Sequence, residues 1–235
     1  MSLSRGRRQR EGTGRRKTVM QEYIWVTGII LKQSPVGEYD RHISLLTKER
    51  GKLSAFARGA RKAGSRLAAA TNPFAFGMFK LYEGKKSYTL TEADIQNYFE
   101  ELRRDYIGAC YGQYFAEVTD YYTRENSDER EMLKLFYQSL RALCAASLPN
   151  PLVKCVFELR AIAVNGEFPG PPTDRELEES TIYCLNYIAE SPIEKLYTFA
   201  VKDSVQEQLE QVAAEYMQKF VGRQFKSLEV LQSLS

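Results

Sequence analysis

Residues 48–66 read KERGKLSAFARGARKAGSR, and the first half of this stretch has the alternating pattern of a β-strand. The apolar side chains of Leu53, Ala55 and Ala57 fall on one face, and polar or aromatic side chains fall on the other. The second half is a glycine-containing basic loop, and the whole stretch holds seven Lys/Arg against one acid, Glu49. A row of cations that continues from a strand into a flexible loop favours a polyanion with an irregular backbone, such as single-stranded nucleic acid.

Further strands are expected on both sides of this stretch, because β-branched and aromatic residues alternate there between turn signals. Gly28, inside the first of them, is predicted to mark a bulge or a bend. Five strands with a short helix between the third and the fourth predict an OB-fold barrel, with another small barrel or a curled sheet as the alternative. The expected strands are 23–34, 40–48, 52–58, 71–82 and 87–95, and the expected helix is 65–70.

From residue 96 onward the apolar spacing becomes helical, which predicts an α-helical bundle and an α+β protein overall. Asn126 with Glu129, and Thr173 with Glu176, are expected to cap two of the helices. The expected helices are 98–122, 126–146, 151–166, 173–190 and 203–222. The predicted organisation is therefore an OB domain over 20–95, a helical protein-interaction domain over 96–235, and an N-terminal extension over 1–19.

Charge is unevenly distributed along the chain. Residues 1–90 carry 19 Lys/Arg and 6 Asp/Glu, whereas the remaining residues carry 14 and 24. Within residues 48–86, ten cations meet only two acids. Such segregation indicates a basic surface for nucleic acid or a membrane, joined to an acidic module.

The extension at residues 2–19 has a net charge of +6 and no apolar periodicity, so it is predicted to be disordered. Met20 opens the first strand, and we interpret it as the natural start and the preceding residues as a start-site artefact. The alternative is a basic arm that binds nucleic acid.

Catalytic motifs are missing from the sequence. His42 is the single histidine, and no Walker loop or GxGxxG is present, so we predict a non-enzyme with no catalytic residue and no cofactor. Asp120 and the acids of 128–131 are interpreted as helix-surface residues. No apolar run is long enough for a membrane span. The cysteines lack CxxC spacing, which argues against zinc and favours buried thiols in a reducing cytoplasm; they are Cys110, Cys144, Cys155 and Cys184.

Aromatic residues lie close to the cations in the β region. About half of them must face the barrel core, and those on the outer face are candidates for base stacking. These residues are Phe56, Phe74, Phe76, Phe79, Tyr82 and Tyr88. A second aromatic set has helical spacing and is predicted to form bundle core; it comprises Tyr111, Tyr114, Phe115, Tyr121 and Tyr122.

Several segments of this sequence resemble the RecO family of bacterial recombination mediators. They are the GEYDR turn at 37–41, LLTKERGKL at 45–53, ARGARKAGSRL at 57–67 and, more weakly, YFEELRRDY at 98–106 and FELRAIAVNGEFP at 157–169. The resemblance implies an OB domain that binds single- and double-stranded DNA and anneals strands. It also implies partnership with RecR in loading RecA onto DNA coated by single-strand-binding protein (SSB), in the cytoplasm at the nucleoid.

One segment departs from the family pattern. Many RecO proteins carry a four-cysteine zinc site after VNGEFP, whereas residues 170–188 contain Cys184 alone. The resemblance therefore indicates a zinc-free branch, with no metal site.

The resemblance and the charge pattern agree on the nucleic-acid site. Gly59 and Gly64 are expected to let the basic loop follow a phosphate backbone. The cations expected to displace counterions are Lys52, Arg58, Arg61, Lys62 and Arg66, with Arg41, Lys80, Lys85 and Lys86 widening the track.

The acidic bundle is expected to dock proteins, and the resemblance nominates the acidic, apolar-ended tail of SSB. The candidate residues are Arg124, Arg130, Lys134 and Arg141. Arg130 and Lys134 form a like-charge i,i+4 pair, which a helix tolerates better beside an anion. Two other classes stay open from the residues alone: an RNA-binding OB protein, and a structural adaptor whose basic patch binds an acidic partner.

Overall fold

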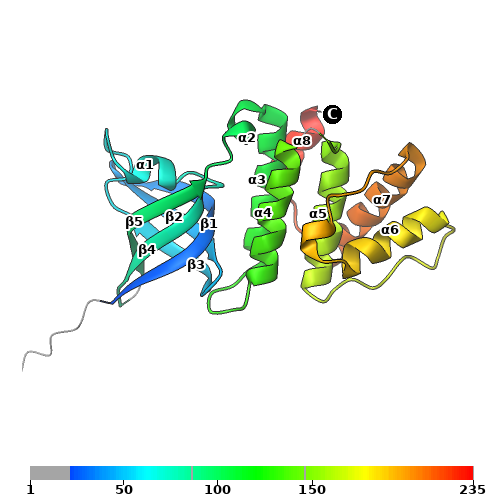
Figure 1. The fold of residues 1–235 in the computed structure, drawn as a ribbon, viewed down its shortest axis with the longest axis horizontal. Coiled ribbons are helices and arrows are strands. Elements are labelled where there is room, and N and C mark those ends of the chain that lie inside the picture. The colour runs from blue at the N-terminus through cyan, green and yellow to red at the C-terminus, as the bar shows by residue number, and fades with distance from the viewer. Residues whose placement is uncertain (1–21, 86, 146, 235) are drawn as a thin grey trace, which may run out of the picture.

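A five-stranded β-barrel followed by a bundle of helices forms the molecule (Figure 1). The computed structural model describes residues 22–85, 87–145 and 147–234. The predicted extension over 1–19, the candidate Lys86 and the predicted helix end at Ala146 lie outside the described residues.

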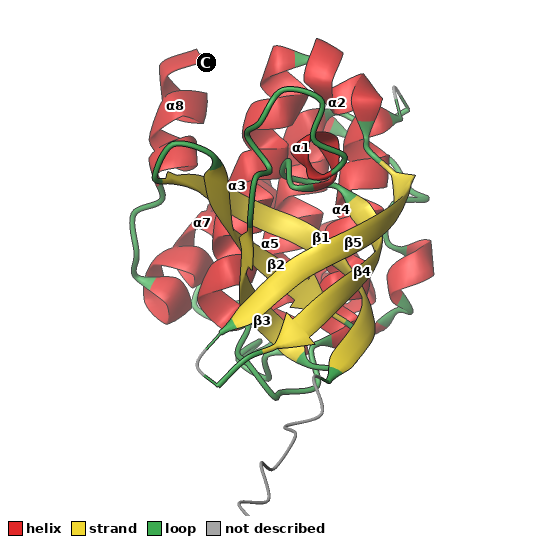
Figure 2. Cartoon of the chain, turned by 90° about the vertical axis from the view of Figure 1, so that its left-hand side faces the viewer, coloured by secondary structure: helices red, strands yellow, loops and turns green. Residues whose placement is uncertain are grey.

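The barrel closes in the order β1-β2-β3-β5-β4, with β4 returning to β1. All neighbouring pairs are antiparallel except β3 with β5, and helix α1 lies between β3 and β4 at one end of the barrel (Figure 2). This arrangement confirms the OB-fold prediction. The strands are β1 Tyr23–Val36, β2 Asp40–Thr47, β3 Gly51–Ala57, β4 Phe76–Glu83 and β5 Tyr88–Asn97, and α1 is Leu67–Ala70.

The barrel core follows the predicted alternation. Leu53, Ala55 and Ala57 of β3 are fully buried, whereas Ser54 between them is exposed. Phe79 and Leu81 of β4 fill the same interior. Burial of these apolar faces, at about 25 cal/mol per Å², is the main term that stabilises the closed sheet.

Gly28 occupies the position where β1 passes from one neighbour to the other. It is paired with Thr47 of β2 and with Gly77 of β4, and a β-bulge follows between Ile30 and Lys32. A Cβ at Gly28 would lie 2.3 Å from the carbonyl oxygen of Leu46. The predicted irregularity therefore lies two residues beyond Gly28, and the close approach of the Leu46 backbone is the physical reason for a glycine at this position.

The bundle confirms the all-α prediction but differs in its helix boundaries. The predicted helix 98–122 is two helices, because the backbone of Asp105 is extended (φ −106°, ψ 99°). Tyr106 and Ile107, at the start of the second of these helices, are exposed. The helices are α2 Glu100–Arg104, α3 Tyr106–Tyr122, α4 Arg130–Cys144, α5 Asn150–Val164, α6 Glu179–Glu190, α7 Asp203–Tyr216 and α8 Lys226–Leu234, with single turns at Ile193–Lys195 and Met217–Val221.

Both predicted capping boxes are wrong. Asn126 adopts a left-handed conformation (φ 58°), and its backbone N–H donates to the carbonyl of Arg50 in the barrel. Helix α6 begins at Glu179, after both Thr173 and Glu176. Tertiary contacts override the local signal at the first of these sites. Helix α8 was not predicted; its Leu231 is buried in the bundle core.

The bundle core contains a buried polar network. Tyr114 and Phe115 are fully buried, as the helical spacing predicted. The Tyr114 hydroxyl donates to Oε1 of Glu158 over 2.5 Å, and Lys154 pairs with Oε2 of Glu158 at 3.0 Å. Burial and the Glu158 carboxylate raise the pKa of Tyr114 well above its usual value. The Glu158 charge is therefore balanced inside the core.

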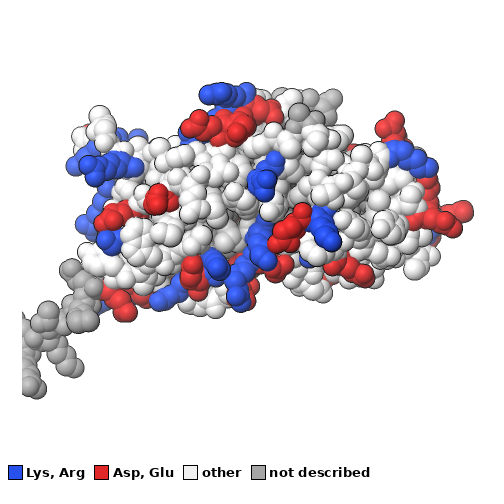
Figure 3. Space-filling model, viewed as in Figure 1, with Lys and Arg blue, Asp and Glu red and all other residues white. Residues whose placement is uncertain are grey.

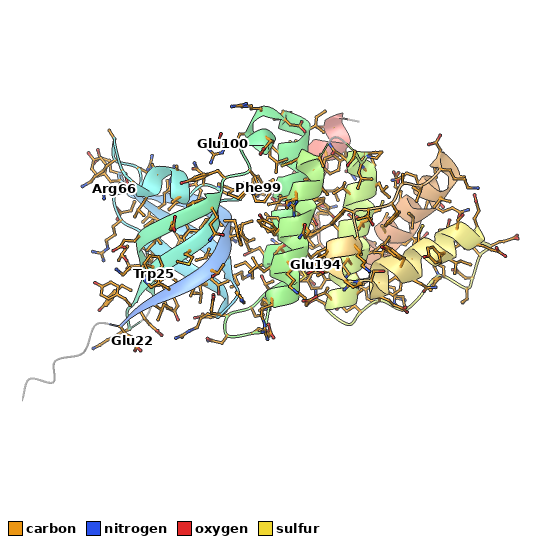
Figure 4. All side chains as sticks on the ribbon, viewed as in Figure 1. Glu22, Trp25, Arg66, Phe99, Glu100 and Glu194 are labelled. Carbon is orange, nitrogen blue, oxygen red and sulfur yellow. The ribbon has the colours of Figure 1, made fainter. Side chains whose placement is uncertain are left out.

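The barrel packs against the bundle through apolar residues on its outer surface. Ile29 and Leu31 of β1, Leu46 of β2 and Phe74 belong to the same buried cluster as the cores of α3, α4 and α5. Phe99 connects the two parts and is itself buried there (Figure 4).

The β2–β3 turn docks directly onto the α3–α4 loop. The N–H of Lys52 donates to the carbonyl of Arg124 over 2.9 Å, and Gly51 forms a β-bridge with Glu125. Gly51 has φ +65°, and a Cβ there would lie 2.3 Å from the Arg124 oxygen. A glycine is therefore required at position 51 for two reasons. The backbone there is left-handed, and a side chain would clash with the Arg124 carbonyl.

Asp120 of α3 was predicted to be a helix-surface acid. Instead, it forms ion pairs with two lysines of the barrel. Its carboxylate lies 2.8 Å from Nζ of Lys32 and 3.1 Å from Nζ of Lys52, and it accepts from Ser44 Oγ over 3.2 Å. Burial alone would raise the pKa of Asp120, but the combined effect of Lys32 and Lys52 lowers it.

We expect Asp120→Asn to lower the free energy of unfolding at pH 7 by about 1–3 kcal/mol, because it leaves Lys52 without its charge partner. A carboxylate with a lowered folded-state pKa contributes stability above its unfolded pKa of about 3.9 and loses it as pH falls through the folded value. The difference between the wild type and Asp120→Asn should therefore shrink in acid. Urea unfolding across pH measures this.

Lys32→Ala is the matched control, because the Lys32 side chain is 59% exposed. Loss of an exposed partner costs at most about 1 kcal/mol. Equal stability of Asp120→Asn and the wild type at pH 7 would contradict the role of Asp120.

Candidate nucleic-acid interface

The basic loop after β3 is anchored to the β1–β2 turn. The N–H of Gly59 donates to Oδ1 of Asp40 over 2.7 Å, and the N–H of Arg61 donates to the carbonyl of Tyr39 over 2.9 Å. Arg61 Nη1 also donates to the carbonyl of Gly37 over 3.1 Å. These contacts hold residues 58–66, which we call the basic loop, in a defined path beside the turn.

Four predicted cations of the basic loop are exposed to solvent. They are Arg58, Arg61, Lys62 and Arg66. None of them forms an ion pair with a carboxylate among the described residues. Lys62 Nζ lies 5.4 Å from the ring centroid of Tyr39, which is 46% exposed. Arg66 lies on the side of the barrel away from the bundle (Figure 4).

The structure places three other predicted cations in intramolecular contacts. Arg41 Nη1 donates to the Ala68 carbonyl and to Oγ1 of Thr71, both over 2.7 Å. Lys52 is bound to Asp120, and Lys80 pairs with Glu92 at 2.9 Å. Arg41 and Lys52 thus hold the fold together, and we leave both out of the nucleic-acid surface proposed below.

Lys85 is exposed in the β4–β5 turn, next to Lys86, which is not among the described residues. In the space-filling view, blue side chains gather over the barrel end that faces away from the bundle, whereas blue and red mix along the bundle (Figure 3). The excess of cations is therefore local to the barrel.

The aromatic candidates divide between core and surface. Phe74, Phe79 and Tyr88 are buried, and Phe76 packs on Tyr137 of α4 with ring centroids 4.6 Å apart. Phe56 and Tyr82 are only partly buried, on the outside of the barrel.

Sequence reasoning missed the most exposed aromatic residues of the barrel. Tyr23 is 50% exposed and Trp25 is 47% exposed. Their signal was present in the sequence, since they alternate along β1 with Ile24 and Val26, which face the barrel interior.

Two of the predicted partner-binding cations line a cavity between the barrel and α4. This cavity, about 330 Å³ in volume, is bordered by Arg130 and Lys134, by Lys48 of the β2–β3 turn and by apolar groups that include Phe76 and Tyr137. We call it the basic–apolar groove. A neighbouring cavity shares its three cations and adds Arg160.

The other two candidates lie differently. Arg124 folds back on the end of α3, where its Nη1 donates to the carbonyl of Tyr121 over 2.5 Å. Arg141 is exposed on α4 and contacts Gln138, which lines the groove.

Anions of the chain itself already stand beside Arg130 and Lys134. Arg130 pairs with Asp128 and lowers the pKa of that carboxyl to about 2, while Lys134 pairs with Glu131 at 3.2 Å. The like-charge pair is therefore balanced internally, at solvent-exposed positions where such pairs are weak.

Cys155 and Cys184 are buried, as predicted, whereas Cys110 and Cys144 are only partly buried. Burial raises the pKa of Cys144 to about 11 and that of Cys155 to about 12. Among the described residues, no three His, Cys, Asp or Glu side chains are grouped to hold a metal ion. Within the same part of the chain, no helix combines the length and apolar character needed to cross a membrane.

Comparison with known proteins matches the barrel and the bundle to the N-terminal and C-terminal models of one protein family. Residues 20–99 match the family model described as recombination protein O N terminal, and residues 103–170 match the model described as recombination protein O C terminal.

Two relatives are similar over nearly the whole chain, and a third is similar over part of it. The DNA repair protein RecO of Acetivibrio thermocellus is 27% identical over 90% of this chain and 97% of its own length. That of Halalkalibacterium halodurans is 24% identical over 88% and 93%. That of Heliobacterium modesticaldum is 36% identical over 60% of this chain and 50% of its own length. With its barrel, its helical bundle and these matches, the chain belongs to the RecO family of DNA repair and recombination proteins, which are non-enzymatic mediators.

Proposed function

We propose that this protein binds single- and double-stranded DNA through the basic loop and anneals complementary strands. The observation that carries the proposal is the group of four exposed cations on the loop, Arg58, Arg61, Lys62 and Arg66, which have no ion-pair partner among the described residues. Unpaired surface cations release condensed counterions from a phosphate backbone when they bind it.

The fixed path of the loop supports binding without sequence preference. Asp40 and the β1–β2 turn hold the loop backbone, so its cations are presented together from one rigid edge of the barrel. Cations presented in this way would contact phosphates and not base edges. Phosphate contacts position a nucleic acid without specifying its sequence. This is the requirement for a protein that acts on any damaged DNA.

Family membership supports the cellular role. We propose that the protein works in the cytoplasm at the nucleoid and, with RecR, helps to load RecA onto DNA coated by SSB. An RNA-binding OB protein and a structural adaptor are the alternatives. A preference for RNA over DNA, or no nucleic-acid affinity at low salt, would favour the first or the second of these alternatives.

The double variant Arg58→Glu with Lys62→Glu should bind single-stranded DNA at least tenfold more weakly, because it replaces two phosphate contacts by repulsion. With about four contacts, one for each loop cation, the wild type should show a slope of log K against log salt of about −3, and the variant a shallower one. Fluorescence anisotropy across a salt titration measures both.

Arg104→Glu with Lys219→Glu is the matched control, since it makes the same charge change at exposed positions of the bundle. The site assignment is refuted if the loop variant and this control bind DNA equally well at every salt concentration.

We propose further that the basic–apolar groove takes the acidic, apolar-ended tail of SSB. Lys48, Arg130 and Lys134 surround apolar walls formed by Phe76 and Tyr137, which matches a peptide whose acids precede an apolar end. The internal pairs of Arg130 and Lys134 are exposed, so their exchange for a peptide carboxylate costs little.

Calorimetry of the intact protein with an SSB tail peptide tests this assignment. Arg130→Ala with Lys134→Ala should weaken binding about tenfold, whereas Arg104→Ala on α2 should not change it. Tail binding that survives the double variant would place the tail elsewhere on the molecule.

A further inference from the structure

A row of side chains crosses the outer surface of the barrel, perpendicular to the strands. Strand register pairs Tyr23 with Tyr82, Tyr82 with Thr89, Thr89 with Phe56 and Phe56 with His42. All five therefore face outward, and the row spans four interstrand spacings of about 4.8 Å each. We call these five residues the aromatic row.

The exposed end of the row is built from ring faces and one cation. The rings of Tyr23 and Tyr82 have centroids 5.6 Å apart, and Trp25 follows Tyr23 on the same face of β1. Lys80 Nζ lies 5.5 Å from the Tyr23 centroid and 5.7 Å from the Trp25 centroid. Large aromatic surface exposed beside a cation is the composition of a platform for unpaired bases.

The opposite end of the row leads to the basic loop. The ring of Phe56 packs edge-on against that of His42, with centroids 5.1 Å apart. Arg58, the first cation of the loop, lies two residues beyond Phe56 along the same chain segment. The row is thus continuous with the proposed phosphate-binding surface.

Acidic residues border the surface on one side. Glu92 pairs with Lys80, and Asp94 stands opposite Met78 on the neighbouring strand. Both lie farther along β5 than Thr89, through which the row passes. A bound strand is therefore favoured along the row toward the basic loop, and disfavoured along β5.

From these contacts we infer that the aromatic row and Trp25 stack the bases of single-stranded DNA, while the basic loop holds its phosphates. The inference rests on the proposed function and adds to it a means of distinguishing single strands from duplex. Bases within a duplex are already stacked on each other, so only an unpaired strand presents faces to these rings. The row would then hold a strand with its bases splayed on the barrel.

Trp25 provides a direct test, because it is the single tryptophan of the chain. An oligo-dT strand should quench its fluorescence on binding. An abasic oligomer of the same length and charge should bind about tenfold more weakly and leave the fluorescence unchanged. Duplex DNA should bind without quenching.

Variants extend the test to the row itself. Tyr23→Ala, Tyr82→Ala and Phe56→Ala should each weaken oligo-dT binding roughly fivefold or more, with duplex binding unchanged. Tyr23→Phe should restore the affinity, since it keeps the ring. Tyr106→Ala, which removes an aromatic residue that is 67% exposed on α3, is the control and should bind as the wild type does. Melting temperatures verify that each variant is folded.

The outcomes separate this inference from the proposed function. Equal affinity for oligo-dT and the abasic oligomer, without quenching, overturns stacking and leaves the electrostatic function in place if the Arg58→Glu, Lys62→Glu variant still loses binding. A wild type that binds none of the DNA probes overturns both. Row variants that lose a protein partner but keep oligo-dT affinity overturn stacking and make this surface a protein interface.

Discussion

The docking of the β2–β3 turn against the end of α3 and the loop after it is the contact on which the arrangement of the whole molecule depends. Gly51 and Lys52 meet the backbone of Arg124 and Glu125, and the carboxylate of Asp120 holds Lys52 and Lys32 at once. Backbone hydrogen bonds, a shared apolar cluster and a half-buried ion network act on the same surface. Such an interface keeps the barrel in one orientation relative to the bundle.

This orientation divides the barrel surface into two parts. Ile29, Leu31 and Leu46 face the helices, and the basic loop and the exposed aromatic rings face solvent on the other side (Figures 1 and 4). The proposed DNA surface and the bundle thus point in different directions. A mediator that contacts DNA and proteins together benefits from this geometry, since neither ligand blocks the other.

The basic–apolar groove lies at the boundary between these two parts. Lys48 reaches it from the barrel, and Arg130 and Lys134 reach it from α4, so the groove exists only while the two parts stay docked. Arg130 and Lys134 of the groove are balanced by neighbouring acids at exposed positions, whereas the loop cations form no ion pairs within the described residues. Because the loop cations lack carboxylate partners in the described part of the chain and Arg130 and Lys134 have them, we propose that the loop binds phosphates and the groove binds a peptide.

The sequence alone determined the five strands, α1 and the helical character of the remainder, because alternation and 3.6-residue spacing are local properties of the chain. Charge segregation and the loop motif also led to the basic loop. The roles of individual cations could not be predicted from the sequence. Lys52 and Arg58 share one face of the predicted strand, yet Lys52 binds Asp120, 68 residues away, and Arg58 is left exposed.

The aromatic row and the backbone conformation of Asn126 were decided in the same way by tertiary structure. Tyr23 and Tyr82 become neighbours, and Phe56 comes into line with them across Thr89, only when the barrel closes, since strand register joins segments that are distant in sequence. Asn126 does not cap a helix, because its backbone N–H donates to the carbonyl of Arg50 across the interface. Local pattern specifies which face of a strand or helix is apolar, and packing between distant segments decides which polar groups remain available for function.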